Sequence, residues 1–334
     1  MNAESTPAVT IHGMERDIAL GLHRTMVRIR AFETQVEQLF LDGRLPGFVH
    51  TYLGEEAIAT GVCARLDAKD YITSTHRGHG HAIAKGLSLD AVMAELYGKV
   101  TGACRGRGGS MHVADFSLGM LGANGIVGGG FGIAAGAAFS ARYRASDQVA
   151  VCFFGDGGIN KGTFHEAMNF AAVHTLPVVY VCENNQYAQF TARQRTTAVD
   201  DLSVRATAYG VTGMQVDGND VGAVWSAAGA AIAHARSGGG PTLLDMHTYR
   251  FGGHYVGDAE VYRDASEVSD RKRLDPVKRW EAALISEGWA TADEITRVWQ
   301  NAEVEVEAAQ RFAEQSADPD PSTALDDVFT EAGP

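Results

Sequence analysis

Residues 149–185 read VAVCFFGDGGINKGTFHEAMNFAAVHTLPVVYVCENN. Two short apolar runs, at 149–154 and 177–182, have the length and composition of buried parallel strands, and a helical segment at 163–174 separates them. The alternation continues downstream, with an expected helix at 199–209, a strand at 211–216, a helix at 220–236 and a strand at 242–247. The pattern predicts an α/β fold whose parallel sheet carries helices on both faces.

Helical segments flank this repeated unit on both sides. Apolar residues recur at helical spacing through 15–42, and further helices are expected at 54–66, 88–97 and 128–144. We expect a flexible N-terminus at 1–14, one ligand-binding domain at 15–275, a helical extension at 276–316 and an acidic tail at 317–334. Pro319 and Pro321 lie in this tail, which is expected to be loosely held.

Composition and charge limit the partners that the chain can bind. Hydrophobic residues make up 45% of the 334 residues, and the net charge of −13 argues against nucleic acid and anionic membranes. The sequence has neither an apolar run long enough for a transmembrane helix nor the pattern of a signal peptide. Its four cysteines are scattered without a CxxC pair, so we expect a protein of the reducing cytoplasm.

The 39 glycines are distributed unevenly along the chain. They gather at 78–86, 102–109, 119–136 and 155–162, between apolar runs, with a smaller group at 238–240. Clusters of this kind suggest tight loops in which the backbone approaches a ligand closely.

The two central strands both end in residues that can bind a ligand. The first runs into Gly155-Asp156-Gly157-Gly158 and the second into Glu183-Asn184-Asn185. Ligands bind at the carboxyl ends of parallel strands, so Asp156 and Asn185 could converge on a hard cation such as Mg²⁺. The glycines would let backbone N–H groups reach a diphosphate, although GDG alone is often only a turn. No GxGxxG or P-loop motif competes with this interpretation.

GDG followed by NN at the end of the next strand resembles the signature of thiamine-diphosphate enzymes. Five further segments resemble the E1 α subunits of 2-oxo acid dehydrogenase complexes: GFVHTYLGEEA (47–57), DYITSTHRGHGHAIAKG (70–86), GRGGSMHVAD (106–115), LGANGIVGGGFGIAAGAA (121–138) and PTLLDMHTYRFGGH (241–254). These segments are most like the acetoin dehydrogenase branch, and the pyruvate branch is second. The resemblance covers about residues 15–275 and implies a thiamine-diphosphate-binding fold with thiamine diphosphate and Mg²⁺ as cofactors.

The resemblance also implies roles for individual residues. Asp156, Asn185 and the backbone carbonyl of Tyr187 match the Mg²⁺ ligands. The remaining cofactor contacts would be Arg77, Gly157 and Gly158 around the diphosphate, and Gly125 and Val127 at the aminopyrimidine ring. His76, which stands where some relatives have a tyrosine, would contact the cofactor as well.

Histidines are the candidate catalytic residues. His50 matches an active-site histidine and His254 matches one on a mobile loop over the cofactor, and both would also contact that cofactor. His79 is a third catalytic candidate, since an imidazole can donate to an oxyanion or move a proton near neutral pH. His76, His79 and His81 could instead form a metal site, which the neighbouring Arg77 disfavours because it repels a cation.

The family resemblance implies partners as well. The glutamate that activates the cofactor comes from a β subunit in this family, and this chain offers no candidate for it, so an α₂β₂ tetramer is expected. The acyl unit would pass to a lipoyl-bearing E2 acyltransferase after cleavage of acetoin or decarboxylation of a 2-oxo acid. Three alternatives stay open: a pyruvate or branched-chain 2-oxo acid dehydrogenase E1 α subunit, a stand-alone α/β carboligase or decarboxylase, and a silent regulatory paralogue. The mobile-loop motif is Gly252-Gly253-His254-Tyr255 here, so it lacks the serine that some relatives phosphorylate.

Overall fold

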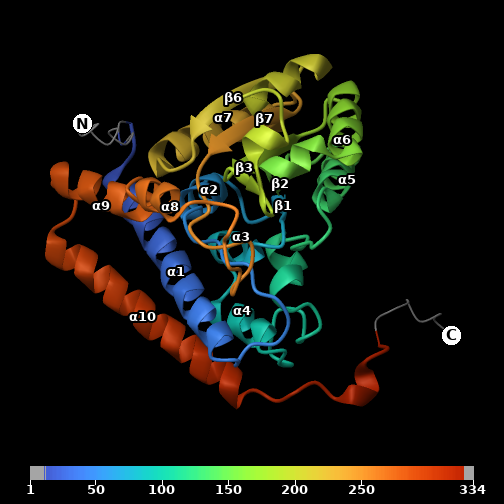
Figure 1. Ribbon diagram of the computed structural model, residues 1–334. Helices are drawn as coiled ribbons and strands as arrows, with labels where there is room; N and C mark the ends of the chain where they lie inside the picture. The colour runs from blue at the N-terminus through green and yellow to red at the C-terminus, as the bar shows by residue number, and fades with distance from the viewer. Residues whose placement is uncertain (1–10, 12, 327–334) are drawn as a thin grey trace.

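The computed structural model describes residue 11 and residues 13–326 (Figure 1). The expected flexible N-terminus and the last part of the expected acidic tail therefore lie mostly outside the described residues. Among the described residues, no helix is both long enough and apolar enough to cross a membrane.

A five-stranded parallel sheet forms the centre of the molecule, and its strand order is β1-β2-β3-β7-β6. The strands are β1 (Tyr71–Thr73), β2 (Ala150–Gly155), β3 (Val178–Asn184), β6 (Thr212–Asp217) and β7 (Thr242–His247). Gly155 at the end of β2 pairs with Glu183 on β3, so the two motifs at these strand ends lie side by side. The predicted α/β fold with a parallel sheet is confirmed.

Helices cover both faces of the sheet because successive residues of its central strands point to opposite sides. On β2, Val151 and Phe153 join one core cluster, whereas Cys152 and Phe154 join the other. The first face packs against α1 (Arg16–Leu41), α2 (Glu56–Cys63), α3 (Gly78–Lys85), α4 (Leu89–Leu96) and α7 (Val221–Arg236). The second face packs against α5 (Gly129–Tyr143) and α6 (Gly162–Val173).

The C-terminal helices pack on the outside of α1 (Figure 1). After α8 (Ala265–Lys272), α9 (Pro276–Ser286) begins with its proline at N1 and is capped by Asp275. α10 (Ala292–Gln315) begins with a capping box made by Thr291 and Glu294 and runs beside α1 and α4. The residues beyond α10 return to the glycine-rich loop, where Lys99 pairs with Asp318 at 2.6 Å.

The structure differs from the sequence prediction at several places. The glycine cluster at 78–86 forms helix α3, not a loop, because Gly80 lets this helix approach the ring of Tyr52, where a Cβ atom would collide. The helix expected at 199–209 is a 3₁₀ stretch, Leu202–Tyr209, pressed against β6 and β7. Strand β1 was not predicted, since three residues are too few to show a periodic pattern.

Candidate active site

A cavity of about 420 Å³ lies at the carboxyl ends of β2 and β3. This volume is in the range of small-molecule and cofactor sites. All but one of the residues predicted for the site line the cavity, although they come from widely separated parts of the chain: His50, His76, Arg77, Gly125, Val127, Asp156, Gly157, Gly158, Asn185, Tyr187 and His254. The exception is His79.

Asp156 is the least satisfied polar group in the cavity. The side chain is 1% exposed, and neither of its carboxylate oxygens has a hydrogen-bond partner among the described residues. Burial raises the pKa of Asp156 to about 7. A buried carboxylate without partners is costly unless a cation or a proton compensates it. The environment of Asp156 therefore suits a cation ligand.

Asn185 lies beside Asp156 at the end of the neighbouring strand, and its amide oxygen is nearly free. The only hydrogen bond to this oxygen within the described part of the chain comes from the Tyr187 backbone N–H, at a long 3.4 Å. Gln186, between these two residues, has a positive φ of 75° and holds the turn by donating to the Asn184 carbonyl at 3.0 Å. Carboxylate, amide and backbone carbonyl oxygens form the donor set that Mg²⁺ prefers, so this group fits the predicted metal.

The turn after β2 needs glycine at position 157 for close approach. Gly157 lies in the 3₁₀ turn Asp156–Asn160, and a Cβ atom there would come within 2.7 Å of the Ala188 Cβ. Gly158 is buried against Phe154, and α6 begins soon afterwards at Gly162. A tight turn that leads into a helix presents backbone N–H groups and suits an anion.

Two buried arginines face the same cavity. Arg77 donates to the backbone carbonyls of Thr51 and His254 at 2.7 and 2.6 Å, and burial together with repulsion from Arg250 lowers its pKa to about 10. Arg250 donates to the Gln189 carbonyl at 3.0 Å. Within the described part of the chain, neither guanidinium forms an ion pair with a carboxylate. Two guanidinium groups that form no ion pair with a described carboxylate can donate to the oxygens of a diphosphate.

Three imidazoles cluster over the cavity. The ring centroid of His50 lies 4.7 Å from that of His76 and 4.9 Å from that of His254. Burial and the charge of Arg77 lower the pKa of His50 to about 3 and that of His254 to about 4, and they also lower the pKa of His76. The rings are therefore neutral at pH 7, and the buried Nδ1 of His50 has no hydrogen-bond partner among the described residues. Neutral imidazoles of this kind can both accept and donate a proton.

His79 and His81 lie behind the cavity wall. His79 is fully buried between Glu33 at 3.1 Å and Ser110 at 2.9 Å, and it does not line the cavity. His81 is held in the same way by Ser74 and Glu183. We therefore do not retain a direct catalytic role for His79. The alternative metal site at His76, His79 and His81 also fails, because every ring nitrogen of His79 and His81 already has a partner.

The sequence reasoning missed three charged residues that line the cavity: Glu55, Glu183 and Arg250. Glu55 is fully buried, and burial together with repulsion from Glu183 raises its pKa to about 8. Glu183 accepts hydrogen bonds from Tyr52 and from His81, the latter at 2.8 Å. Glu55 and Arg250 belong to segments that carried the family resemblance, but no local pattern separates them from their neighbours.

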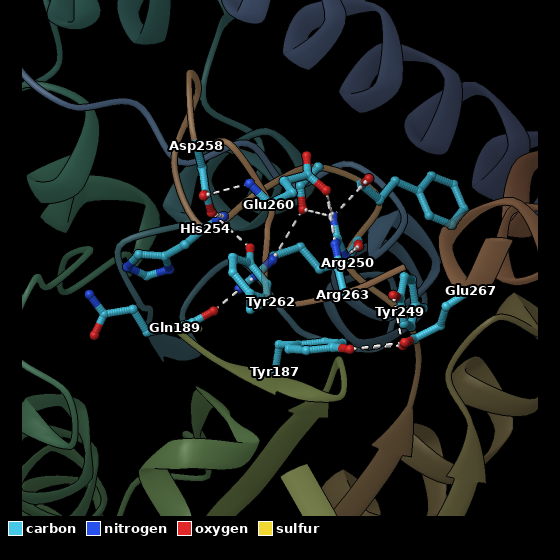
Figure 2. A network of polar contacts seen from close by, with 12 residues as sticks. Tyr187, Gln189, Tyr249, Arg250, His254, Asp258, Glu260, Tyr262, Arg263 and Glu267 are labelled. Atoms are coloured by element: carbon cyan, nitrogen blue, oxygen red, sulfur yellow. Dashed lines mark hydrogen bonds and ion pairs between the residues drawn. The ribbon is translucent and has the colours of Figure 1, made fainter. Parts of the chain in front are cut away.

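The loop that carries His254 is held by a dense network of polar contacts (Figure 2). Asp258 accepts from the His254 backbone N–H at 2.7 Å, from the Glu260 N–H at 3.0 Å and from the Tyr262 hydroxyl at 2.7 Å. Arg263 donates to the Arg250 carbonyl at 2.7 Å and forms an ion pair with Glu260 at 2.6 Å. The structure thus places His254 on a loop with many internal polar contacts, and the mobility implied by the family resemblance stays a prediction.

Comparisons with known proteins identify relatives over almost the whole chain. A family model described as "Dehydrogenase E1 component" matches residues 24–322. The α subunit of acetoin:2,6-dichlorophenolindophenol oxidoreductase from Bacillus subtilis is 50% identical over 93% of each chain, and the protein of that name from Cupriavidus necator is 45% identical over 95% of each. The pyruvate dehydrogenase E1 component α subunit of Rhizobium meliloti is 40% identical over 96% of this chain and 92% of its own.

Proposed function

The chain belongs to the dehydrogenase E1 component family, and we propose that it is the α subunit of an acetoin-cleaving E1 enzyme. Membership of this family implies thiamine diphosphate as the cofactor. The two relatives named for acetoin are 50% and 45% identical to this chain, whereas the pyruvate relative is 40% identical. Acetoin is therefore the proposed substrate, and pyruvate or a branched 2-oxo acid is the alternative.

The single observation that carries the proposal is the unpartnered carboxylate of Asp156, which faces a cavity with two buried arginines. Asp156, Asn185 and the carbonyl of Tyr187 would hold Mg²⁺, while Arg77 and the turn at Gly157 would hold the diphosphate. Thiamine diphosphate supplies a carbanion that cleaves the bond next to a carbonyl group. One cavity thus contains candidate ligands for the metal ion and candidate donors for the diphosphate.

The chain's own residues would provide electrostatics and proton transfer. His50 and His254 are neutral near pH 7, so each can donate a hydrogen bond to an oxygen that gains negative charge or accept a proton. The Nδ1 atom of His50, which has no partner among the described residues, gives this residue an open position for that task. Arg77 bonds to the carbonyl of His254 and so fixes the loop while its charge faces the cavity.

We also propose that a β subunit completes the site, in an α₂β₂ assembly. The relatives are named as α subunits, and Ile126 and Val127 at the cavity edge are 72% and 50% exposed, which is unusual for apolar side chains at an active site. Transfer of the acyl unit to a lipoyl-bearing E2 belongs to the same proposal. The four free cysteines support a reducing compartment such as the cytoplasm.

Co-expression with the β subunit tests the proposed function. The purified complex should reduce dichlorophenolindophenol with acetoin, and this activity should require added thiamine diphosphate and Mg²⁺. Activity with pyruvate and branched 2-oxo acids, measured in the same assay, ranks the substrates. If acetoin is the poorest of these substrates, the assignment to acetoin is wrong. Release of free aldehyde without any acyl transfer to a lipoyl domain would favour the stand-alone enzyme, and cofactor binding without turnover would favour the silent paralogue.

A further inference from the structure

Glu55 lines the cavity but is not among the proposed metal ligands. Its side chain is fully buried, and it occupies the N-cap position of α2. A Ser, Thr, Asp or Asn side chain at this position usually accepts a hydrogen bond from the first turn of its own helix, but Glu55 makes no such bond. Its carboxyl group instead contacts Asn185, which lies 130 positions further along the chain.

The contact between Glu55 and Asn185 fixes the orientation of the asparagine amide. Both carboxyl oxygens of Glu55 lie 3.1 Å from the Asn185 Nδ2 atom. An ionised carboxylate can only accept hydrogen bonds, and a neutral carboxyl group keeps one carbonyl oxygen that accepts, so Glu55 can hold Nδ2 in either protonation state. The opposite end of the amide, Oδ1, is then left with only the weak bond from the Tyr187 N–H.

No other described side chain anchors Nδ2 of Asn185. Glu183, the other carboxylate at this end of β3, is engaged by Tyr52 and His81. Without Glu55, the Asn185 amide could rotate and direct its N–H₂ group at the cation. The positive end of the amide and the cation would then repel each other. One buried carboxyl group thus determines which end of this side chain faces the cavity.

We propose that Glu55 is a positioning residue that keeps Oδ1 of Asn185 directed at the metal ion. The inference rests on the proposed function, because it requires Asn185 to be a metal ligand. Loss of a residue that orients a ligand typically lowers metal affinity by about 10- to 100-fold. The expected phenotype is therefore weaker metal binding in a protein that is otherwise folded.

Mn²⁺ in place of Mg²⁺ gives a direct readout, because free Mn²⁺ has an electron paramagnetic resonance signal that falls on binding. The α–β complex would be titrated with Mn²⁺ in the presence of excess thiamine diphosphate. We expect Glu55→Met, which keeps the chain length but removes the acceptor, to weaken Mn²⁺ binding by about 10-fold or more. Glu55→Gln keeps an acceptor oxygen for Nδ2 and should stay within about 3-fold of the unmodified complex.

Glu55→Asp distinguishes the effect of the negative charge from the effect of the contact with Asn185. It also replaces Glu55→Met in the test if that variant does not fold. It keeps the negative charge but withdraws the oxygens by one methylene, so it should weaken Mn²⁺ binding as Glu55→Met does. Glu33→Met is the matched control, since it removes another fully buried carboxyl group, which contacts His79 and not Asn185. The control should bind Mn²⁺ within about 3-fold of the unmodified complex.

Three results would overturn the positioning role: unchanged affinity in Glu55→Met or Glu55→Asp, an equal loss in Glu55→Gln, or an equal loss in Glu33→Met. Failure of the unmodified complex to bind Mn²⁺ with thiamine diphosphate would instead contradict the proposed function. The two failures are thus distinguishable in one set of titrations.

Discussion

Two aspartates at the same end of the sheet have opposite environments. Asp156, in the cavity, has no hydrogen-bond partner for either oxygen among the described residues, and burial raises its pKa to about 7. Asp258, in the neighbouring loop, is also partly desolvated, which acts to raise its pKa, but hydrogen bonds from Glu260, His254 and Tyr262 lower that pKa overall (Figure 2).

This contrast distinguishes residues that can bind a ligand from residues that hold the loop in place. Asp156 and His50 line the cavity, and both have buried polar atoms without partners in the described part of the chain. The two arginines beside them form no ion pair with a described carboxylate. The polar groups of the cavity are therefore free to bind a ligand. The loop network satisfies its own polar groups and thereby fixes the position of His254. Unsatisfied buried groups cost stability, and binding sites commonly carry this cost.

The same substitution at the two aspartates should give the largest and clearest difference. Asp156→Asn removes a buried charge without partners, so it should stabilise the cofactor-free protein by about 1–3 kcal/mol while lowering metal affinity at least ~100-fold. Asp258→Asn loses charge-assisted hydrogen bonds and should destabilise the protein by about 1–2 kcal/mol with metal affinity nearly unchanged. Urea unfolding and Mg²⁺ titration measure these quantities. Destabilisation by Asp156→Asn would show that Asp156 has a structural role.

His50→Ala tests the catalytic half of the cavity. We expect turnover to fall by about 10²- to 10⁴-fold, because a proton-transfer group is lost, while affinity for thiamine diphosphate changes only a few-fold. Steady-state rates and calorimetric titration of the cofactor separate the two effects. His79→Ala is the comparison variant, since His79 lies behind the wall and should affect activity mainly through stability. A large loss of cofactor binding in His50→Ala would argue for a binding role.

Part of the candidate site could be predicted from the sequence alone. Asp156 and Asn185 follow apolar strands directly, so the rule that ligands bind at the carboxyl ends of parallel strands is enough to place them at the site. His50, Arg77 and His254 entered through family resemblance alone, and the structure brings them into one cavity. These segments are distant in the sequence, and only tertiary packing decides that they meet.

Glu55 and His79 show why the remaining assignments could not be made from the sequence. Glu55 stands in a Glu-Glu pair at the start of a helix, where either residue could serve as a helix cap, and its contact with Asn185 depends on a separation of 130 residues. His79 lies two positions after Arg77, but helix α3 begins at Gly78 and turns its side chain to Glu33 on α1. The local sequence contains no signal for either outcome.

The pH dependence of stability tests the cavity histidines. The folded-state pKa of His50, about 3, and that of His254, about 4, lie below the usual value, so between these values and about pH 6.5 the unfolded chain binds more protons. The two histidines should therefore lower the stability of the cofactor-free protein by about 1–3 kcal/mol as the pH decreases from about 6.5 to 4, whereas Asp156 and Glu55, whose pKa values are raised, contribute in the opposite direction. His50→Asn should therefore lose less stability on acidification than the unmodified protein does, as measured by urea unfolding at several pH values. An equal loss in the two proteins would mean that His50 is not buried in its neutral form.

Tyr262→Phe should have the smallest effect, and it tests the loop side of the contrast. The variant removes the hydroxyl that donates to Asp258 at 2.7 Å and accepts from Arg250 at 2.9 Å, while the ring can stay against Phe190. Asp258 keeps its two backbone donors, so the global loss of stability should be about 1 kcal/mol or less. Because the lost contacts lie within one loop, amide hydrogen exchange should accelerate around residues 250–263 and not in β2 or β3. If amide exchange in β2 and β3 accelerates equally, the loop does not open independently and instead unfolds together with the sheet.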